Sequence, residues 1–486
     1  MPEKRTAYRV LALNTIAFTV CFAAWMLNGV LVTFLVDNRI FDWNAAQMGM
    51  LIGIPVLTGS LMRLPLGVLT DKYGGRPVYA LLMLLSAVPM FMLGQANSYN
   101  EYMIYSLGFG MTGTSFAVGI AFSSVWFSKE RQGTALGIFG AGNAGAALTT
   151  LGAPSLLRWL TNNGENLENW RKLPAYYAVA LVVMAVFFYL FTTNRKPENG
   201  QRSLVQMLAP LKQVRVWRFG LYYFLVFGGF VALAQWLVPY YVNVYAMTIV
   251  TAGLLTSIFS LPSGVIRALG GVLSDKFGAR AVMYWVFGFI AVCSFLLFFP
   301  KMSIESPGSG VMARRSGTVT SVTANEIQVD DTTYSLIPKV DVEYGADEVI
   351  LLPRINTWQD ANVEVGDQVA KKELLASGVT HIYFQANVWV FTFFVFIIGI
   401  AMGIGKAGVY KFIPEYFPTE VGVVGGIVGV VGGLGGFVSP IIFGSLLKSI
   451  GLWTTTWIFF FFITMLCLIW MGLSVRKNAK KREVEA

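Results

Sequence analysis

The feature that most constrains this sequence is a series of apolar stretches about 20 residues long, separated by short polar clusters that hold most of the charge. A helix needs roughly 20 mostly apolar residues to cross a bilayer. Only 13% of the 486 residues are charged, whereas soluble domains carry roughly 25%. The stretches therefore predict an all-α membrane protein embedded in a lipid bilayer. Twelve transmembrane helices are expected near residues 10–36, 46–70, 77–95, 102–127, 133–159, 174–193, 218–243, 249–274, 281–299, 385–412, 421–447 and 452–475.

The basic residues predict the orientation of these spans. They gather at both ends of the chain, in residues 4–9 and 476–482, and in the alternate loops at residues 72–76, 129–131 and 195–218. Loops rich in Lys and Arg stay on the cytoplasmic side, so we expect a multi-pass protein of the cell inner (cytoplasmic) membrane with both termini cytoplasmic. The net charge of +10 does not predict a nucleic-acid partner, because such a site would gather its charge on one face or tail.

Two internal repeats divide the chain into halves. Residues 63–76 (RLPLGVLTDKYGGR) match residues 267–280 (RALGGVLSDKFGAR) at an offset of 204 positions, and residues 137–145 (GIFGAGNAG) match residues 426–434 (GIVGVVGGL) at an offset of 289. About 85 residues are therefore inserted in the second half. Parallel repeats are typical of transporters that hold the substrate near the midplane. We expect a six-helix bundle in 1–193, a cytoplasmic linker in 194–217, a second six-helix bundle in 218–299 and 385–486, and an extracytoplasmic insertion in 300–384.

The insertion, between the ninth and tenth spans, has the composition of a small β domain. Residues 317–322, 326–329 and 348–352 are rich in β-branched side chains and bounded by turn residues, which predicts short strands. Residues 363–376 (VEVGDQVAKKELLA) look like the hairpin of biotinyl/lipoyl-type barrels, but without a lysine in that family's modification motif. We expect an accessory domain or assembly surface, with ligand sensing as the alternative. The protein is expected to be a monomer, with oligomerisation through this domain as the alternative.

Two arginines lie deep inside apolar spans, at the equivalent repeat positions Arg63 and Arg267. A charge at bilayer depth costs roughly 2.5–3.5 kcal/mol on insertion scales, and an anion held between the two arginines would compensate for it. The alternative is that both side chains reach the cytoplasmic interface. Guanidinium is planar and offers a fork of donors suited to a flat oxyanion. The arginines alone leave phosphate esters and dicarboxylates equally open.

The glycine-rich stretches narrow this choice by resemblance. GIFGAGNAG in the fifth span and GIVGVVGGLGGF in the eleventh resemble the two nitrate signatures of the nitrate/nitrite porter family, within the major facilitator superfamily. The resemblance implies the major facilitator fold of two pseudo-symmetric six-helix bundles, and transport of nitrate and nitrite by alternating access. The substrate-binding residues that it implies are Arg63, Arg267, Asn143, Tyr223, Phe116, Phe227, Gly140 and Gly432.

Each of these residues also has a simpler interpretation. Glycines allow close helix packing without any role in transport, and single aromatic residues more often only pack between helices. Gly140, Gly142 and Gly145 spell G-x-G-x-x-G, but a dinucleotide fingerprint requires a preceding strand, and this one lies within an apolar span.

The first repeat also matches the superfamily's loop motif between the second and third spans. Charges at helix ends can form a cytoplasmic latch that breaks during alternating access. A single surface pair contributes only about 0–1 kcal/mol, so such a latch must be a network. The residues assigned to gating are Asp71, Lys72, Arg76, Asp275, Lys276 and Arg280.

The tenth span, GIGKAGVYKFIPEYF (residues 403–417), carries Lys406 in its apolar part and Lys411 closer to the surface. This stretch looks like the branch of the family associated with nitrate/proton symport, so symport and nitrate/nitrite antiport both stay open. Lys406 could release its proton when the cavity is empty and regain it when an anion binds. The alternative is that it stays charged and helps to hold the anion.

Other function classes are disfavoured. His381 is the only histidine, and Cys21, Cys293 and Cys467 all lie in apolar stretches, so neither a metal site nor a cofactor is expected, and we do not expect an enzyme. A transporter of an organic phosphate or carboxylate is the main alternative, against which the glycine signatures argue. A membrane-bound sensor would tolerate a degraded repeat, and this repeat is intact.

Overall fold

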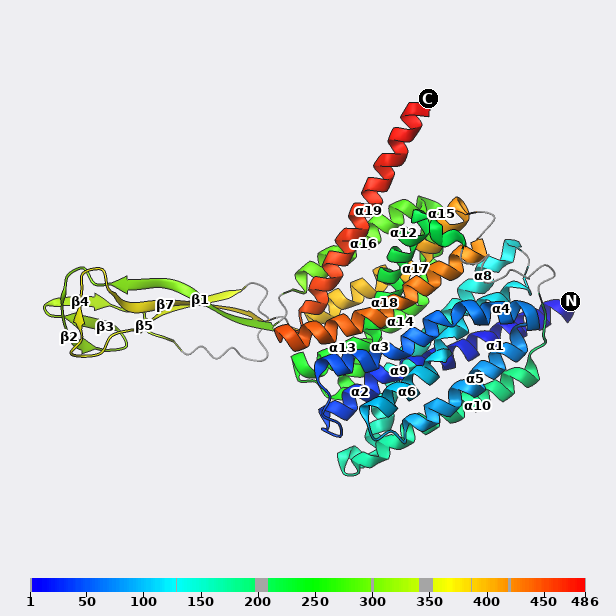
Figure 1. Cartoon of the computed structure of the whole chain (residues 1–486), viewed down its shortest axis with the longest axis horizontal. Helices are drawn as coiled ribbons and strands as arrows, with labels where there is room; N and C mark the ends of the chain where they lie inside the picture. The colour runs from blue at the N-terminus through cyan, green and yellow to red at the C-terminus, as the bar shows by residue number, and fades with distance from the viewer. Residues whose placement is uncertain are drawn as a thin grey trace. The chain divides into compact units, whose positions relative to one another are not determined.

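The computed structural model describes residues 2–127, 129–196, 209–298, 301–340, 353–385, 387–417 and 421–485 (Figure 1). The chain divides into two compact units, one formed by Met1–Leu296 with Thr392–Ala486 and the other by Leu297–Phe391. We call them the helical unit and the β unit. Residues 197–208 of the expected linker lie outside the described residues.

The N-terminal half of the helical unit follows the first six predicted spans, most of which are broken into two helices. Its α-helices are α1 (Pro2–Trp25), α2 (Leu27–Asp37), α3 (Ala45–Leu61), α4 (Arg63–Tyr73), α5 (Gly75–Leu93), α6 (Tyr99–Phe109), α7 (Ser115–Ser124), α8 (Lys129–Gly140), α9 (Gly145–Leu160) and α10 (Lys172–Phe191). Short 3₁₀ segments join them at η1 (Gly110–Thr114), η2 (Ala141–Ala144), η3 (Asn162–Gly164) and η4 (Leu167–Arg171).

The C-terminal half contains the other six predicted spans. It begins with the 3₁₀ turn η5 (Ala209–Lys212), and a π-helical segment, η6 (Phe224–Gly228), interrupts its first span. Its α-helices are α12 (Val214–Tyr223), α13 (Gly229–Tyr245), α14 (Ile249–Val265), α15 (Arg267–Phe277), α16 (Ala279–Leu296), α17 (Val388–Tyr416), α18 (Val421–Ile450) and α19 (Thr455–Glu485).

The number of membrane-spanning helices agrees in part with the prediction. Among the described residues, ten helices are long and apolar enough to cross a membrane, or eleven when α14 and α15, bent by 47° at their junction, are taken as one span. The remaining predicted span, residues 133–159, is occupied by α8, η2 and α9. Its 3₁₀ interruption divides the apolar stretch into two shorter helices.

The helices differ in burial as expected for a bundle in a bilayer, with buried central helices and outer helices that expose apolar side chains. Every residue of α13 from Gly229 to Tyr241 is buried, so this helix is central. On α5 and α10, by contrast, exposed apolar side chains such as Leu84, Val88 and Val182 lie around a shallow apolar hollow. A large exposed apolar surface on a soluble protein marks an interaction site; here it is the surface that lipid would cover.

Alternate connections lie at the same end of the helical unit (Figure 1). We call the end with the α4–α5 and α15–α16 connections the proximal end, and the end with the α2–α3 and α13–α14 connections the distal end.

At the distal end the two halves meet backbone to backbone. A Cβ atom on Gly49 of α3 would lie 2.2 Å from the carbonyl oxygen of Pro440 in α18, and one on Gly253 of α14 would lie 2.0 Å from that of Thr150 in α9. Only glycine allows helices to approach so closely. The structure is therefore closed at its distal end.

The β unit consists of two small sheets around its own core. The strands are β1 (Lys301–Met312), β2 (Gly317–Val322), β3 (Glu326–Val329), β4 (Thr332–Ser335), β5 (Arg354–Ala361), β6 (Gln368–Val369) and β7 (Leu374–Gln385), in the sheet orders β1-β7-β5 and β4-β3-β2-β6. Val319, Ile327, Tyr334 and Leu375 are among the buried residues between them.

The predicted strands 317–322 and 326–329 coincide with β2 and β3, while 348–352 lies outside the described residues. The expected hairpin of residues 363–376 is not formed. β6 pairs with β2, through Gly317 and Val369, whereas β7 pairs with β1 and β5 in the other sheet. The long register of β7 with β1 takes this strand away from β6.

Candidate substrate-binding site

The two buried arginines occupy the same unusual backbone position. Arg63 is the first residue of α4 and Arg267 is the first residue of α15, and in each case one residue separates the helix from the one before it. Pro65 explains the first break, because a proline is tolerated in the first turn of a helix and not in its interior. In the second half, Pro262 lies within the last turn of α14. Each guanidinium therefore starts from an irregular part of its span.

The backbone carbonyls at these breaks are capped by side chains. In an unbroken helix the amides of Arg63 and Arg267 would pair with the carbonyls four residues earlier, those of Gly59 and Ser263. Instead the Gly59 oxygen accepts a hydrogen bond from the Thr114 hydroxyl at 3.4 Å, and the Ser263 oxygen accepts one from the Lys406 ammonium at 3.1 Å. Both breaks are therefore stabilised by a side-chain donor.

The Arg63 side chain is only 4% exposed and crosses from one half to the other. Its Nη1 donates to the carbonyl oxygen of Gly429 in α18 at 2.5 Å, while its Nε and Nη2 have no hydrogen-bond partner. The guanidinium carbon lies 5.2 Å from the Phe227 ring centroid and 6.0 Å from that of Trp25. Arg63 thus keeps two unused donors in an aromatic environment.

Arg267 faces the same aromatic group from the other half. Its guanidinium carbon lies 5.3 Å from the Phe116 ring centroid, and that of Arg63 lies 5.7 Å from the same point. Tyr410 flanks Arg267 at 5.5 Å. The Arg267 Nη1 is buried and has no hydrogen-bond partner. Phe116 is therefore shared by the two cations.

The rings form a continuous row across the two halves. Phe116 stacks on Phe227 with centroids 6.2 Å apart, and Phe227 stacks on Tyr223 at 5.0 Å with the two planes only 5° apart. Tyr223 then meets Tyr410 edge to face at 5.0 Å. Phe227 lies within the π-helical segment η6, and such segments inside helices frequently mark functional sites.

The glycines of α18 make room for this row. A Cβ atom on Gly432 would lie 2.2 Å from Cδ1 of Tyr223, and one on Gly433 would lie 2.2 Å from Oγ of Ser60. In the fifth span, a Cβ atom on Gly140 would lie 3.6 Å from Cδ of Arg267, an ordinary contact. A larger residue at position 432 would therefore collide with the Tyr223 ring, whereas Gly140 lies beside Arg267 without being crowded by it.

Asn143 lies in η2 and is fully buried. Its side-chain amide donates to the carbonyl of Gly140 at 2.9 Å, and its Oδ1 has no hydrogen-bond partner. Its backbone packs against Gly264 in α14. Asn143 is thus hydrogen-bonded to Gly140, which lies beside Arg267. Among the described residues, its side chain forms no hydrogen bond with either guanidinium.

Lys406 is 0% exposed, and its ammonium is already engaged. Besides the bond to Ser263, Nζ lies 3.3 Å from the ring centroid of Phe230. A cation over an aromatic face is stabilised by about 2 kcal/mol when desolvated. Lys406 therefore caps a backbone carbonyl at the break before Arg267, besides adding a positive charge near the site.

The residues assigned to gating lie at the proximal end, and their recorded contacts stay within each half. Arg76 donates to the carbonyl of Tyr189 at 2.7 Å, Arg280 donates to the hydroxyl of Tyr416 at 3.4 Å, and Asp275 pairs with Lys411. Lys72 and Lys276 lie over the rings of the residues that follow them, at 5.3 Å in both cases. Asp71 makes no ion pair among the described residues.

Two members of the site were not anticipated from the sequence. Trp25 and Tyr410 each face an arginine. Tyr410 follows Lys406 by four positions on the same span, which places both on one helix face, so its position carried a usable signal. Trp25 ends α1 and gave no such signal.

Together these groups suit a small, flat, singly charged anion. Within the described part of the chain, no acidic side chain pairs with either guanidinium, and no group of side chains could hold a metal ion. Buried charges are stable only when they are paired. An anion would accept hydrogen bonds from the unused donors of Arg63 and Arg267, and the aromatic row would exclude water around it.

Comparison with known proteins identifies the family of the chain. The family model of the Major Facilitator Superfamily matches residues 13–321 and 374–486. A probable nitrate/nitrite antiporter, NarK1, of Thermus thermophilus is 38% identical over 480 residues, covering 98% of this chain and 93% of that protein. A probable nitrate/nitrite transporter, NarK2, of Mycobacterium tuberculosis is 33% identical over 276 residues, covering 56% and 68%. A nitrite extrusion protein of Bacillus subtilis is 28% identical over 310 residues, covering 63% and 75%.

Solved structures show the same fold at low identity. A bacterial homologue of the human lysosomal transporter Spinster, in an inward-facing and occupied conformation, superimposes with a TM-score of 0.63 at 13% identity, over 97% of both chains. The nucleoside transporter NupG gives a TM-score of 0.58 at 13% identity, over 96% of this chain and 98% of that one.

Proposed function

Since the chain belongs to the Major Facilitator Superfamily and, within it, to the nitrate/nitrite porters, we propose that it is a secondary transporter that moves nitrate and nitrite across the cytoplasmic membrane by alternating access. The observation that carries this proposal is the pair Arg63 and Arg267, which face one shared ring and keep unused donors in a buried site.

The bound anion lies between the two guanidinium groups. Arg63 donates through Nε and Nη2, and Arg267 donates through Nη1. Phe116 and Phe227 lie beside the anion, so that a planar oxyanion fits where a tetrahedral phosphate ester would meet the rings.

Twelve spans in two six-helix bundles carry the site. The basic residues at the proximal end support a cytoplasmic position for that end and for both termini, with the β unit on the extracytoplasmic side. The distal contacts of Gly49 and Gly253 then form the closed extracytoplasmic gate. Opening that gate requires these glycines to separate from Pro440 and Thr150, while the proximal residues from Asp71 to Arg76 and their repeat engage.

Exchange of nitrate for nitrite is the coupling that the site supports best. Lys406 contacts the Ser263 carbonyl and the Phe230 ring, so its position does not depend on a bound anion. Proton symport requires a group that changes its protonation during the cycle. Without an anion, the change between the inward-open and outward-open states would bury two unpaired arginines, which is unfavourable. Exchange of one anion for another avoids this step and is therefore the favoured cycle.

The test is flux in proteoliposomes that contain the purified protein. Labelled nitrate should enter rapidly when nitrite is inside and slowly when the lumen lacks a permeant anion. An imposed pH gradient alone should not drive accumulation. Uptake that depends on the pH gradient and not on internal nitrite would replace exchange with symport, and absence of nitrate flux in both arms would overturn the assignment.

A further inference from the structure

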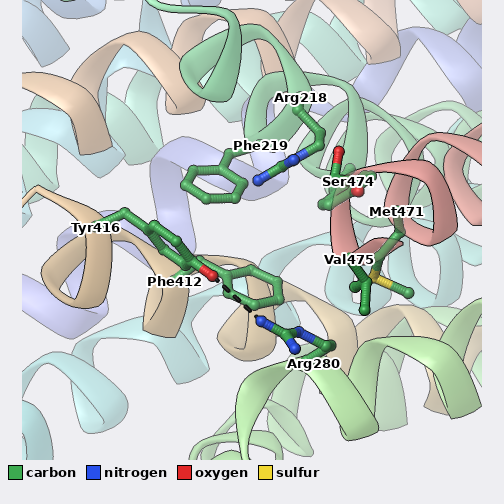
Figure 2. Close-up of a pocket in the computed structure, with 9 residues that line it drawn as sticks. Arg218, Phe219, Arg280, Phe412, Tyr416, Met471, Ser474 and Val475 are labelled. Atoms are coloured by element: carbon green, nitrogen blue, oxygen red, sulfur yellow. Dashed lines mark hydrogen bonds between the residues drawn. The ribbon is translucent and has the colours of Figure 1, made fainter. Parts of the chain in front are cut away.

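A second cluster of arginines lies at the proximal end of the C-terminal half, away from the substrate site. Arg218 of α12 and Arg280 of α16 reach into one pocket from opposite sides (Figure 2). The pocket is small and partly open to solvent. Arg215 lies close by, with its guanidinium 5.2 Å from the ring centroid of Tyr416. Three cations therefore gather around one cavity.

These cations have no acidic partner in the described ranges of the chain. Arg218 is partly buried, and its guanidinium lies 5.4 Å from the Phe219 ring. Arg280 donates a hydrogen bond to a neutral hydroxyl, that of Tyr416. Arg280 projects from the N-terminal end of α16, which adds the positive end of a helix dipole. The pocket is thus strongly positive, as far as the described residues show.

The walls of the pocket distinguish it from a purely aqueous ion site. Phe219 and Phe412 stack with centroids 5.2 Å apart and planes 5° apart, and form an aromatic wall. Met471, Ser474 and Val475 of α19 line the other side. A ligand there meets two guanidinium groups and a hydroxyl as well as apolar side chains.

Exposed apolar residues continue from the pocket along the helices that form it. Trp217 of α12 is 49% exposed, Trp285 of α16 is 70% exposed, and Leu473 of α19 is 59% exposed. Tryptophan at the end of a span is typical of the headgroup level of a bilayer. Basic pockets between membrane helices on the cytoplasmic side bind anionic headgroups.

We propose that this pocket binds the phosphate group of an anionic phospholipid of the cytoplasmic leaflet. Arg218 and Arg280 contact the phosphate oxygens as planar forks, Ser474 donates its hydroxyl, and the acyl chains run along the exposed apolar residues of α12 and α16. Free phosphate shares the headgroup chemistry but not the acyl contacts. Because Arg280 also belongs to the repeated loop motif, the bound lipid contacts a residue of the proximal gate.

The experiment measures the melting temperature (Tm) of the full-length protein in a neutral detergent, with added phosphatidylglycerol, phosphatidylcholine or inorganic phosphate. Phosphatidylglycerol should raise the Tm of the wild type by several degrees, and phosphatidylcholine should raise it much less. Arg218→Gln should lose at least half of that rise. Lys212→Gln, which removes one charge at the same end without lining the pocket, should keep all of it.

Each outcome decides the proposal. If inorganic phosphate reproduces the Arg218-dependent rise, the site is real but its occupant is free phosphate, and the lipid assignment is overturned. If phosphatidylglycerol stabilises Arg218→Gln as much as the wild type, or stabilises neither, the site is wrong. Should Arg218→Gln not fold, Arg280→Gln provides the same comparison, and native mass spectrometry of the wild type with equal phosphatidylglycerol and phosphatidylcholine should show preferential retention of the anionic lipid.

Discussion

Arg63 donates a hydrogen bond through Nη1 to the carbonyl oxygen of Gly429, at 2.5 Å. A side chain from the N-terminal half is thereby bonded to the backbone of the eleventh span in the other half. A Cβ atom on Gly429 would lie 3.2 Å from the Tyr410 hydroxyl, a tight contact, and 3.6 Å from Nη1 of Arg63, an ordinary one. In the proposed cycle, anion binding and the approach of the two halves therefore depend on the same guanidinium.

The shape of the aromatic row depends on Gly432. In Gly432→Ala, the added methyl group would collide with the Tyr223 ring, and overpacking of this kind costs roughly 1–3 kcal/mol. We expect Gly432→Ala to lower the rate of nitrate flux in proteoliposomes at least several-fold. The matched control is Gly137→Ala, in the other glycine signature, where a Cβ atom meets nothing within 4 Å. Equal loss in both variants would show that the signatures act through helix propensity and not through the aromatic row.

The β unit is expected to be dispensable for transport. In β1 and β7, Met302 pairs with Phe384 and Ser303 with Tyr383, so replacing residues 303–383 by a short flexible turn joins two neighbouring strands without moving either. Nitrate flux should stay close to that of the wild type, measured per correctly inserted molecule. If a well-folded deletion shows no flux, the β unit belongs to the transport mechanism.

A substitution of Lys406 tests whether this residue contributes to stability or to proton coupling. Lys406→Met keeps most of the apolar part of the side chain but leaves the Ser263 carbonyl without its donor, which costs about 1–3 kcal/mol for a buried group. We expect a lower Tm with nitrate/nitrite exchange retained and no new dependence on a pH gradient. Lys411→Gln, which breaks a surface pair with Asp275, should change the Tm little. If uptake by the wild type is driven by a pH gradient and that drive disappears in Lys406→Met, Lys406 carries the coupled proton.

The sequence predicted the fold at the level of apolar stretches and repeats. The offset between the two repeats located the insertion, and β-branched residues identified β2 and β3. The one-residue breaks before Arg63 and Arg267 were missed, because a break of this length leaves the hydropathy of a span unchanged. Pro65 was the available signal for the first of them.

The candidate site was anticipated unevenly for a similar reason. The repeat identified the arginine pair, because buried charges at equivalent positions require a common explanation. Tyr410 and the capping contact of Lys406 depend on how two spans rotate against each other, which no local pattern encodes. The assignment of Asp71, Lys72, Arg76, Asp275, Lys276 and Arg280 to gating stays a prediction, because the distal end is the closed one in this structure.

The most direct test of the central claim is nitrate binding to the purified Arg63→Lys and Arg267→Lys variants, by isothermal titration calorimetry in detergent. Each variant keeps the charge and loses the planar fork. Loss of hydrogen bonds to a charged group costs about 1.5–3 kcal/mol, so nitrate affinity should fall roughly 10- to 150-fold in both variants. The exposed Arg39 gives the control, and Arg39→Lys should bind as the wild type does. Wild-type affinity in either Arg63→Lys or Arg267→Lys would contradict the proposal that these two side chains hold the anion.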